Sequence, residues 1–217
     1  MALITTSVPD ITSGVDALAT LGPLAATLAP PGAVLVVIDP FLHASGVFDR
    51  IRETLDEAGV DAGAFTEIAG EPKASDLRAA HRRAREAHAV MVVGVGGGSA
   101  LDVAKITAAT ARAAHDPSVH ALGELPLPAE TLPKIMIPTT AGTGSETSAT
   151  NIFSDDDGRK TWIWGPRTKA DHVILDPRLT VSLPAQLTAW CGMDAIVHAF
   201  EAATNRNTHR GATLFAH

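Results

Sequence analysis

Three short, mostly aliphatic runs constrain the fold of this chain more than any other feature. The runs are residues 33–38 (AVLVVI), 89–93 (AVMVV) and 134–137 (KIMI). None alternates between apolar and polar residues, which is typical of parallel strands covered on both faces. Helical patterns lie between or beside them, at about 47–58, 75–87 and 99–114. Strands that alternate with helices predict an α/β fold built on a doubly wound, mostly parallel sheet.

The character of the sequence changes after the third run. Residues 138–148 are rich in Thr, Gly and Ser, which is typical of a loop. Two short segments, 151–153 and 160–164, then flank an acidic, glycine-containing turn and predict a β-hairpin. A further short strand is predicted at 173–175.

A last helical pattern opens at Leu183-Pro184 and continues to about residue 203. Proline is permitted in the first turn of a helix. We therefore predict a domain boundary near residue 178. Residues 1–178 would form the α/β domain, and residues 179–217 would be the beginning of a helical domain that this chain contains only in part.

Composition and charge exclude several kinds of partner. The net charge is −7, whereas a nucleic-acid site needs clustered Lys and Arg. The single cysteine fits a reducing compartment. No signal peptide is visible, and the longest purely aliphatic run is too short to span a bilayer. These features predict a cytoplasmic protein that binds neither nucleic acid nor a membrane.

A glycine-rich turn with the sequence GVGGGS covers residues 94–99, between the second aliphatic run and a helical pattern. Glycines in this setting let a pyrophosphate approach the backbone at a helix amino terminus, where a Cβ would block it. The turn lacks the third glycine of the usual G-x-G-x-x-G fingerprint, and a plain strand-to-helix turn is the alternative. The density of glycines favours nucleotide phosphate binding by Gly96, Gly97, Gly98 and Ser99, and we expect Ser99 to cap the helix as well.

Asp39 ends the first aliphatic run, so it is expected at the carboxyl edge of the sheet, where such folds bind ligands. A carboxylate there accepts hydrogen bonds from a ribose diol and repels a 2′-phosphate, which predicts NAD over NADP. The alternative is that Asp39-Pro40 only caps the following turn. A second loop, PTTAGTGSE at 138–146, leaves the same edge and offers hydroxyls that suit phosphate or nicotinamide contacts.

Asp194 and His198 lie four residues apart in the last helical pattern. On a helix this spacing places a carboxylate and an imidazole on one face, about one turn apart. They are a candidate half of a divalent-metal site, although the spacing alone occurs often by chance. Oxygen and nitrogen ligands suit both Fe(II) and Zn(II). A catalytic metal needs at least three protein ligands.

Together, three motifs resemble the iron-containing alcohol dehydrogenases. The motifs are GVGGGSALDVAK at 94–105, IPTTAGTGSETS at 137–148 and GMDAIVHAFEA at 192–202. They occur in that family's order and at about its spacing. The resemblance implies a Rossmann-like domain that binds NAD(P), a helical domain that binds a divalent metal, and an alcohol substrate in the cleft between them.

The resemblance also implies roles for single residues. Asp39 matches the acidic position that favours NAD. The pyrophosphate loop is matched by Gly96, Gly97, Gly98 and Ser99. Asp102 matches the Asp of the helix that follows and is also expected to bind the cofactor. Thr139, Thr140 and Thr143 match the second cofactor loop, and Lys160 resembles a lysine that reaches the adenosine ribose. Asp194 and His198 match the first two metal ligands, with Fe(II) favoured over Zn(II). Glu201 is expected to pack the helix or support the ligands, and Cys191 matches no ligand position.

Other interpretations stay open at this point. Maleylacetate reductases share the fold but lack the metal-binding Asp and His. Glycerol dehydrogenase-like enzymes use zinc and a polyol. The family's two further histidine ligands come later than His209 and His217, so residues 1–217 alone are expected to be a catalytically inactive nucleotide-binding fragment. An open sheet edge is compatible with a homodimer.

Overall fold

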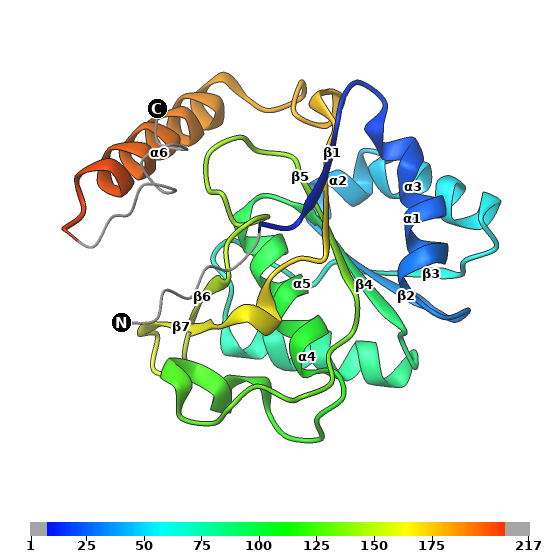
Figure 1. The fold of residues 1–217 in the computed structure, drawn as a ribbon, viewed down its shortest axis with the longest axis horizontal. Helices are drawn as coiled ribbons and strands as arrows, with labels where there is room; N and C mark the ends of the chain where they lie inside the picture. Colours follow the sequence, from blue (N-terminus) through cyan, green and yellow to red (C-terminus); the bar gives the residue numbers. More distant parts are fainter. Residues whose placement is uncertain (1–7, 207–217) are drawn as a thin grey trace.

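The computed structural model describes residues 8–206 (Figure 1). Its centre is a sheet of six parallel strands in the order β1-β8-β5-β4-β2-β3. The strands are β1 (Asp10–Ser13), β2 (Val34–Ile38), β3 (Ala62–Phe65), β4 (Met91–Gly96), β5 (Lys134–Pro138) and β8 (His172–Leu175). The predicted doubly wound α/β fold is confirmed.

Helices cover both faces of this sheet, and Figure 1 shows them as two outer layers. These covering helices are α1 (Leu21–Leu28), α2 (Pro40–Ala44), α3 (Val47–Glu57), α4 (Ala74–Glu86) and α5 (Gly98–Thr110), and a sixth helix, α6 (Ala185–Thr204), lies apart from them. Successive residues of β2 point to opposite faces. Leu35 and Val37 join the core under α4 and α5, whereas Val36 and Ile38 join the core under α1 and α3. Burial on both faces explains why the central strands are continuous aliphatic runs.

The predicted hairpin is also present, as an antiparallel pair of β6 (Thr150–Ser154) and β7 (Lys160–Trp164). Its inward residues Phe153 and Ile163 are buried in the α5 core. The hairpin thus extends the α5 face beyond the sheet. Short 3₁₀ turns complete the connections, at η1 (Ala17–Thr20), η2 (Pro117–Gly123), η3 (Pro166–Thr168) and η4 (Pro177–Leu179).

The strand order reverses between β2 and β4. From β2 the chain moves to one side to form β3, then crosses back to form β4 on the other side. The loops that leave the carboxyl ends of β2 and β4 therefore diverge and leave a crevice, which is where open α/β sheets bind ligands. Asp39 follows β2 and Gly97 follows β4, and the Asp39 amide donates to the Val95 carbonyl at 3.2 Å. The fold thus places the predicted site residues at the switch point.

Helix α6 differs from the others because none of its residues is buried. Figure 1 shows it apart from the two helix layers, beyond the carboxyl ends of the strands. Large apolar side chains are exposed along it, including Trp190, Met193 and Phe200. The predicted boundary near residue 178 and the helical domain that begins after it stay predictions, and His209 and His217 lie outside the described residues.

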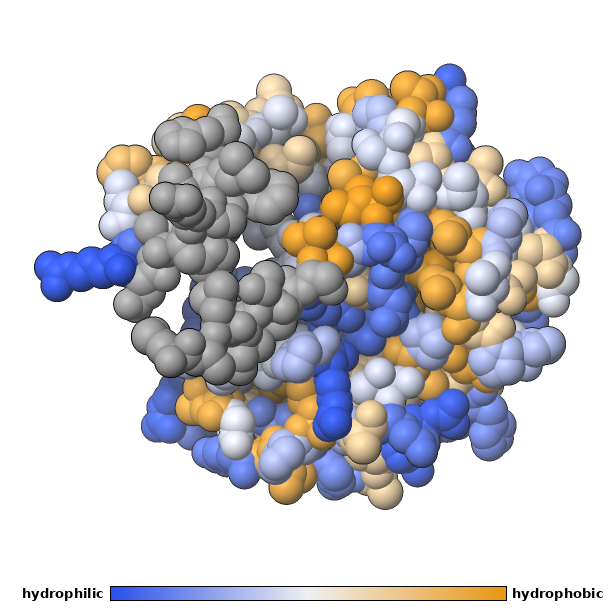
Figure 2. Space-filling view, viewed as in Figure 1, coloured by the Kyte–Doolittle hydropathy of each residue, from blue (hydrophilic) through white to orange (hydrophobic). Residues whose placement is uncertain are grey.

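Polar and apolar side chains mix over the face that Figure 2 shows. Within residues 8–206, no helix combines the length and apolar character that crossing a bilayer requires.

Candidate functional site

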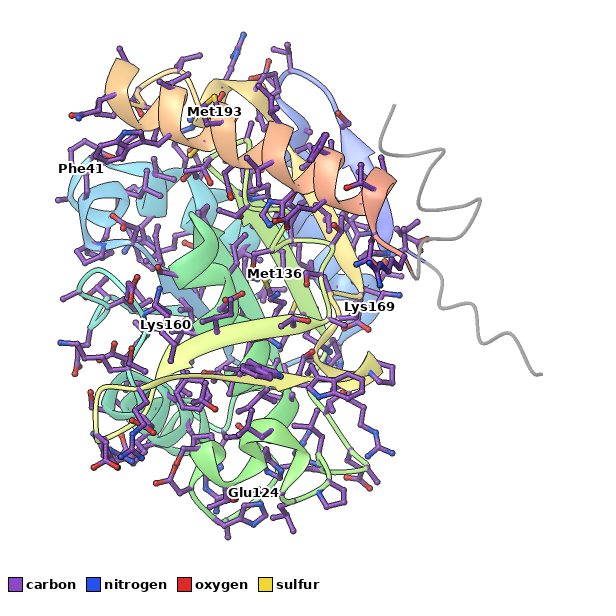
Figure 3. The ribbon with its side chains drawn as sticks, turned by 90° about the vertical axis from the view of Figure 1, so that its left-hand side faces the viewer. Phe41, Glu124, Met136, Lys160, Lys169 and Met193 are labelled. Atoms are coloured by element: carbon purple, nitrogen blue, oxygen red, sulfur yellow. The ribbon has the colours of Figure 1, made fainter. Side chains whose placement is uncertain are left out.

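A cavity of about 710 Å³ lies between the start of α5, the loop after β5, the hairpin and α6. It brings together seven of the residues that the sequence singled out. They are Gly98, Ser99, Asp102, Thr143, Lys160, Asp194 and His198. Figure 3 shows α6, with Met193 labelled, lying across the top of the molecule and Lys160 on the hairpin below it. The other predicted residues, Asp39, Gly96, Gly97, Thr139 and Thr140, do not line this cavity but lie around its glycine turn.

The glycine turn is shaped by close contacts on both sides. Gly96 has a φ of +147°, and a Cβ there would lie 2.9 Å from the Ala100 Cβ. A Cβ on Gly98 would lie 3.2 Å from the Thr143 Cγ2. Larger residues would therefore displace either the helix or the loop. Gly98 and Ser99, the first two residues of α5, line the cavity. This is the arrangement that binds an anion at a helix amino terminus.

The expectation that Ser99 caps α5 is wrong. Gly97 is the capping residue, and Ser99 is the second residue of the helix. The cause is that the helix begins two residues earlier than a Ser99 cap requires, at Gly98, with Gly97 as the cap. The Ser99 hydroxyl is therefore left for a ligand, and it makes no hydrogen bond within residues 8–206.

The threonine loop packs directly on the glycine turn. The Thr139 amide donates to the Gly96 carbonyl at 2.9 Å. A Cβ on Gly97 would lie 3.4 Å from the Thr140 Cγ2. The Thr140 Oγ1 is buried without a hydrogen-bond partner among the described residues. An unpartnered buried hydroxyl beside a phosphate-type turn is a polar group that a ligand can satisfy.

Asp39 has the capping role that the sequence left open, and its ribose role stays a prediction. It is the capping residue of α2, and its Oδ1 accepts a hydrogen bond from the Phe41 amide at 2.8 Å. Its Oδ2 has no partner among the described residues. The carboxylate lies against the glycine turn, because a Cβ on Gly96 would lie 3.4 Å from the Asp39 Cβ. Capping uses one oxygen, and the other stays available to a ligand.

Asp102 lines the cavity, but its carboxylate is used by the protein. Oδ1 accepts from the Ser145 hydroxyl at 2.5 Å, and Oδ2 accepts from the Ile152 amide at 2.9 Å. The buried ammonium of Lys105 lies 3.2 Å from Oδ1. Sequence reasoning missed Lys105, which a helical pattern would place on a surface. The only signal was its position three residues after Asp102.

Lys160 lies on the rim of the cavity. Its ammonium is paired with the Glu71 carboxylate at 2.9 Å, and both side chains are exposed. Glu71 also lines the cavity and was not predicted. Lys160 shares this cavity with Asp194 and His198, whereas Asp39 lies outside it.

Asp194 and His198 face the same cavity from α6. The Asp194 Oδ1 and the His198 Nδ1 are 3.5 Å apart, and the side chains are 44% and 57% exposed. One carboxylate and one imidazole at this separation fit part of the ligand set of a divalent ion. Within residues 8–206 no group of three or more His, Cys, Asp or Glu is arranged to hold a metal. Cys191, a half-buried free thiol, lies one turn earlier on α6.

Comparisons with known proteins agree on one family. A sequence profile described as "Iron-containing alcohol dehydrogenase" matches residues 9–177. "Long-chain-alcohol dehydrogenase 1" of Geobacillus thermodenitrificans is 39% identical over 178 residues, which are 80% of this chain and 44% of that protein. "Choline dehydrogenase" of Bacillus subtilis is 36% identical over 89% of this chain and 49% of its own length.

Solved structures give the same result. A structure of 1,3-propanediol oxidoreductase has a TM-score of 0.91 and 29% identity, covering 99% of this chain and 56% of that one. Sulfoacetaldehyde reductase from Bifidobacterium kashiwanohense, in complex with NAD⁺, has a TM-score of 0.86 and 29% identity, covering 93% of this chain and 53% of that one. The chain thus spans about half the length of the proteins it matches.

Proposed function

This chain belongs to the iron-containing alcohol dehydrogenase family, and from that membership we propose that the protein transfers a hydride between an alcohol, or its aldehyde or ketone, and NAD. The observation that carries the proposal is the shared cavity. Gly98 and Ser99, at the amino terminus of α5, line it together with Asp194 and His198. A phosphate-bearing cofactor and a metal-held oxygen would meet there.

We propose that three segments of the α/β domain bind the cofactor. The amides of the glycine turn and the Ser99 hydroxyl bind the pyrophosphate, and the free oxygen of Asp39 accepts from the adenosine ribose. Thr139, Thr140 and Thr143 form the wall against the nicotinamide half. These contacts fix the cofactor so that the nicotinamide reaches the α6 end of the cavity, since orientation of the reacting atoms is the protein's main contribution to such chemistry.

We propose that Lys160 contacts the nicotinamide ribose of the cofactor and not the adenosine ribose. The resemblance implied the adenosine ribose. Because Lys160 lines the cavity with Asp194 and His198 and Asp39 does not, we assign Lys160 to the nicotinamide ribose instead.

Asp194 and His198 are proposed to hold a divalent ion, Fe(II) in preference to Zn(II). When bound, such an ion supplies Lewis-acid polarisation of the substrate oxygen. Two ligands are fewer than a catalytic metal needs, so residues 1–217 alone are still expected to be inactive. We further propose a cytoplasmic location, a small alcohol or aldehyde as substrate, and a homodimer. The similarities do not favour the glycerol dehydrogenase-like alternative.

The test is metal-restored turnover of the intact protein. After chelation, addition of Fe(II) or Zn(II) should restore NADH formation with a primary monoalcohol, and Mg(II) should not, because it is a poor match for an imidazole ligand. Turnover that survives chelation would contradict the metal assignment. A preference for glycerol over every monoalcohol would revive the polyol alternative.

The role of Asp39 is tested by Asp39→Asn, which keeps the oxygen that caps α2 and removes the charge. We expect kcat/KM with NADP⁺ to rise about tenfold, because the negative charge that repels the 2′-phosphate is lost. Asp39→Gly should show the same gain, offset by the lost cap. The control is Asp56→Asn on the exposed surface of α3. Unchanged NADP⁺ use in both Asp39 variants would remove this residue from the ribose site.

A further inference from the structure

Lys105 is a fully buried lysine in the middle of α5, with a side chain that is 0% exposed. Its ammonium donates to the Ser145 carbonyl at 2.7 Å and to the Ser148 carbonyl at 3.2 Å, with the Thr150 carbonyl at 3.4 Å. The Asp102 carboxylate lies 3.2 Å away. All these partners are acceptors, so only the protonated amine satisfies them.

This bonding separates Lys105 from a catalytic base. Burial lowers the pKa of the Lys105 ammonium, and the neighbouring Asp102 carboxylate opposes that shift. A base must present a free lone pair to the substrate. Here every N–H is directed at a backbone carbonyl or at Asp102, and the nitrogen does not line the cavity.

The segment held by Lys105 and Asp102 is one wall of the cofactor cavity. It runs from Ser145 to Ile152, and four of its residues line the cavity: Ser145, Ser148, Thr150 and Ile152. The first part of this segment has no regular secondary structure. Asp102 holds its two ends through the Ser145 hydroxyl and the Ile152 amide, and Lys105 holds the carbonyls between them.

The opposite wall belongs to the same helix. Gly98 and Ser99, which begin α5, lie one and two turns before Asp102 and Lys105. Helix α5 therefore carries the proposed anion-binding terminus and also binds residues 145–152 through hydrogen bonds. The distance between the two walls therefore depends on the hydrogen bonds that Asp102 and Lys105 make to this loop.

We propose that Lys105, acting with Asp102, is a positioning residue that sets the width of the NAD cavity by holding residues 145–152 at a fixed distance from the glycine turn. The inference rests on the proposed function, because it takes NAD as the ligand. It also reassigns Asp102, which the resemblance placed among the cofactor contacts, to this positioning pair.

Lys134 offers a matched control for the loss of a buried lysine. It lies at the amino end of β5, away from the cavity, and its side chain is also buried. Its ammonium contacts the Leu132 carbonyl and the Asp171 carboxylate, each at 3.4 Å. Burial lowers its pKa as well. Both Lys→Met changes therefore remove a buried ammonium from a carbonyl and a carboxylate, but only one of them touches the cavity wall.

The experiment measures two quantities on the intact protein and its variants. NAD⁺ affinity is measured by calorimetry, and amide hydrogen exchange of residues 143–152 is measured without ligand. Lys105→Met should raise the Kd for NAD⁺ about tenfold, from the loss of hydrogen bonds to a charged group. It should also speed exchange across the segment, and Lys105→Arg should restore part of both. Lys134→Met should leave both unchanged, although it too lowers thermal stability.

Several results would overturn the inference. One is an unchanged Kd and unchanged exchange in Lys105→Met, and another is an equal loss of affinity in Lys134→Met. Should Lys105→Met not fold, Ser145→Ala decides, because it removes only the hydroxyl that Asp102 holds and should weaken NAD⁺ about threefold. If the unchanged protein binds no NAD⁺, the proposed function fails, while the exchange measurement still decides whether Lys105 holds the wall.

Discussion

Replacing Asp194 or His198 by alanine should lower kcat/KM of the metal-restored protein at least about a thousandfold. The pair supplies one oxygen and one nitrogen ligand, and loss of either leaves a metal with too few protein contacts to be retained. Both side chains are about half exposed, and neither makes a hydrogen bond to another residue in the described part of the chain. Their removal should therefore leave the thermal unfolding temperature almost unchanged. The measurements are metal content by elemental analysis, kcat/KM with a primary alcohol, and thermal melting.

Cys191→Ser is the control for this experiment. Cys191 lies on the same helix, also close to the cavity, but it was assigned no ligand role. It should retain metal and turnover. The metal site would be refuted if the Asp194 and His198 variants kept their iron and their activity, and a parallel loss in Cys191→Ser would show that α6 itself, not the ligand pair, had been disturbed.

Gly142→Ala should reduce turnover by about a hundredfold through displacement of α6. A Cβ at this position would lie 2.3 Å from the Cys191 carbonyl oxygen and 2.8 Å from the Cys191 Cα. Backbone atoms cannot rotate away as a flexible side chain can, so the loop or the helix must move. Because Asp194 and His198 follow Cys191 on α6, such a movement shifts both ligands relative to the glycine turn. A misplacement of about 1 Å is enough for a loss of this size.

Gly192→Ala is the matched change. It adds the same methyl group one residue after the contact, inside α6, where nothing lies within 4 Å of the new Cβ. Alanine should stabilise the helix there by about 0.5–1 kcal/mol and leave turnover intact. The NAD⁺ affinity and the metal content of both variants separate a displaced helix from an unfolded protein. If Gly142→Ala behaved like Gly192→Ala, the contact between the loop and α6 would not position the metal pair.

The inner strands could be predicted because a strand buried on both faces needs a continuous run of aliphatic residues, which is visible in the sequence. The edge strands could not. β1 (DITS) is polar and mostly exposed. β3 (AGAF) has three small, partly buried residues before the buried Phe65, so neither strand carries the aliphatic signature of β2 or β4. Both strands exist because a neighbour offers them a hydrogen-bonding edge, which is a property of the assembled sheet.

The candidate site divides in the same way. The glycine turn and the threonine loop were predictable because their chemistry is local to a few consecutive residues. Lys105 was not, since the carbonyl groups that it binds lie 40 to 45 residues further along the chain. A lysine in a helical pattern predicts a solvated face. Only the folded structure shows that backbone carbonyl groups surround the Lys105 ammonium. The pairing of Glu71 with Lys160, 89 residues apart, was hidden for the same reason.

The position of β1 has a consequence for the order in which this chain folds during synthesis. Among the strands of residues 8–206, β1 pairs only with β8, and the register joins Asp10 to His172. A ribosome adds about 5–20 residues per second, so the first strand waits roughly 8–30 s for its partner to be made. The rest of the sheet, from β2 to β5, is complete well before then. The amino-terminal strand is thus among the last parts of the sheet to fold, and until residue 175 has emerged the nascent protein carries an unfilled sheet edge that a chaperone or a neighbouring chain can occupy.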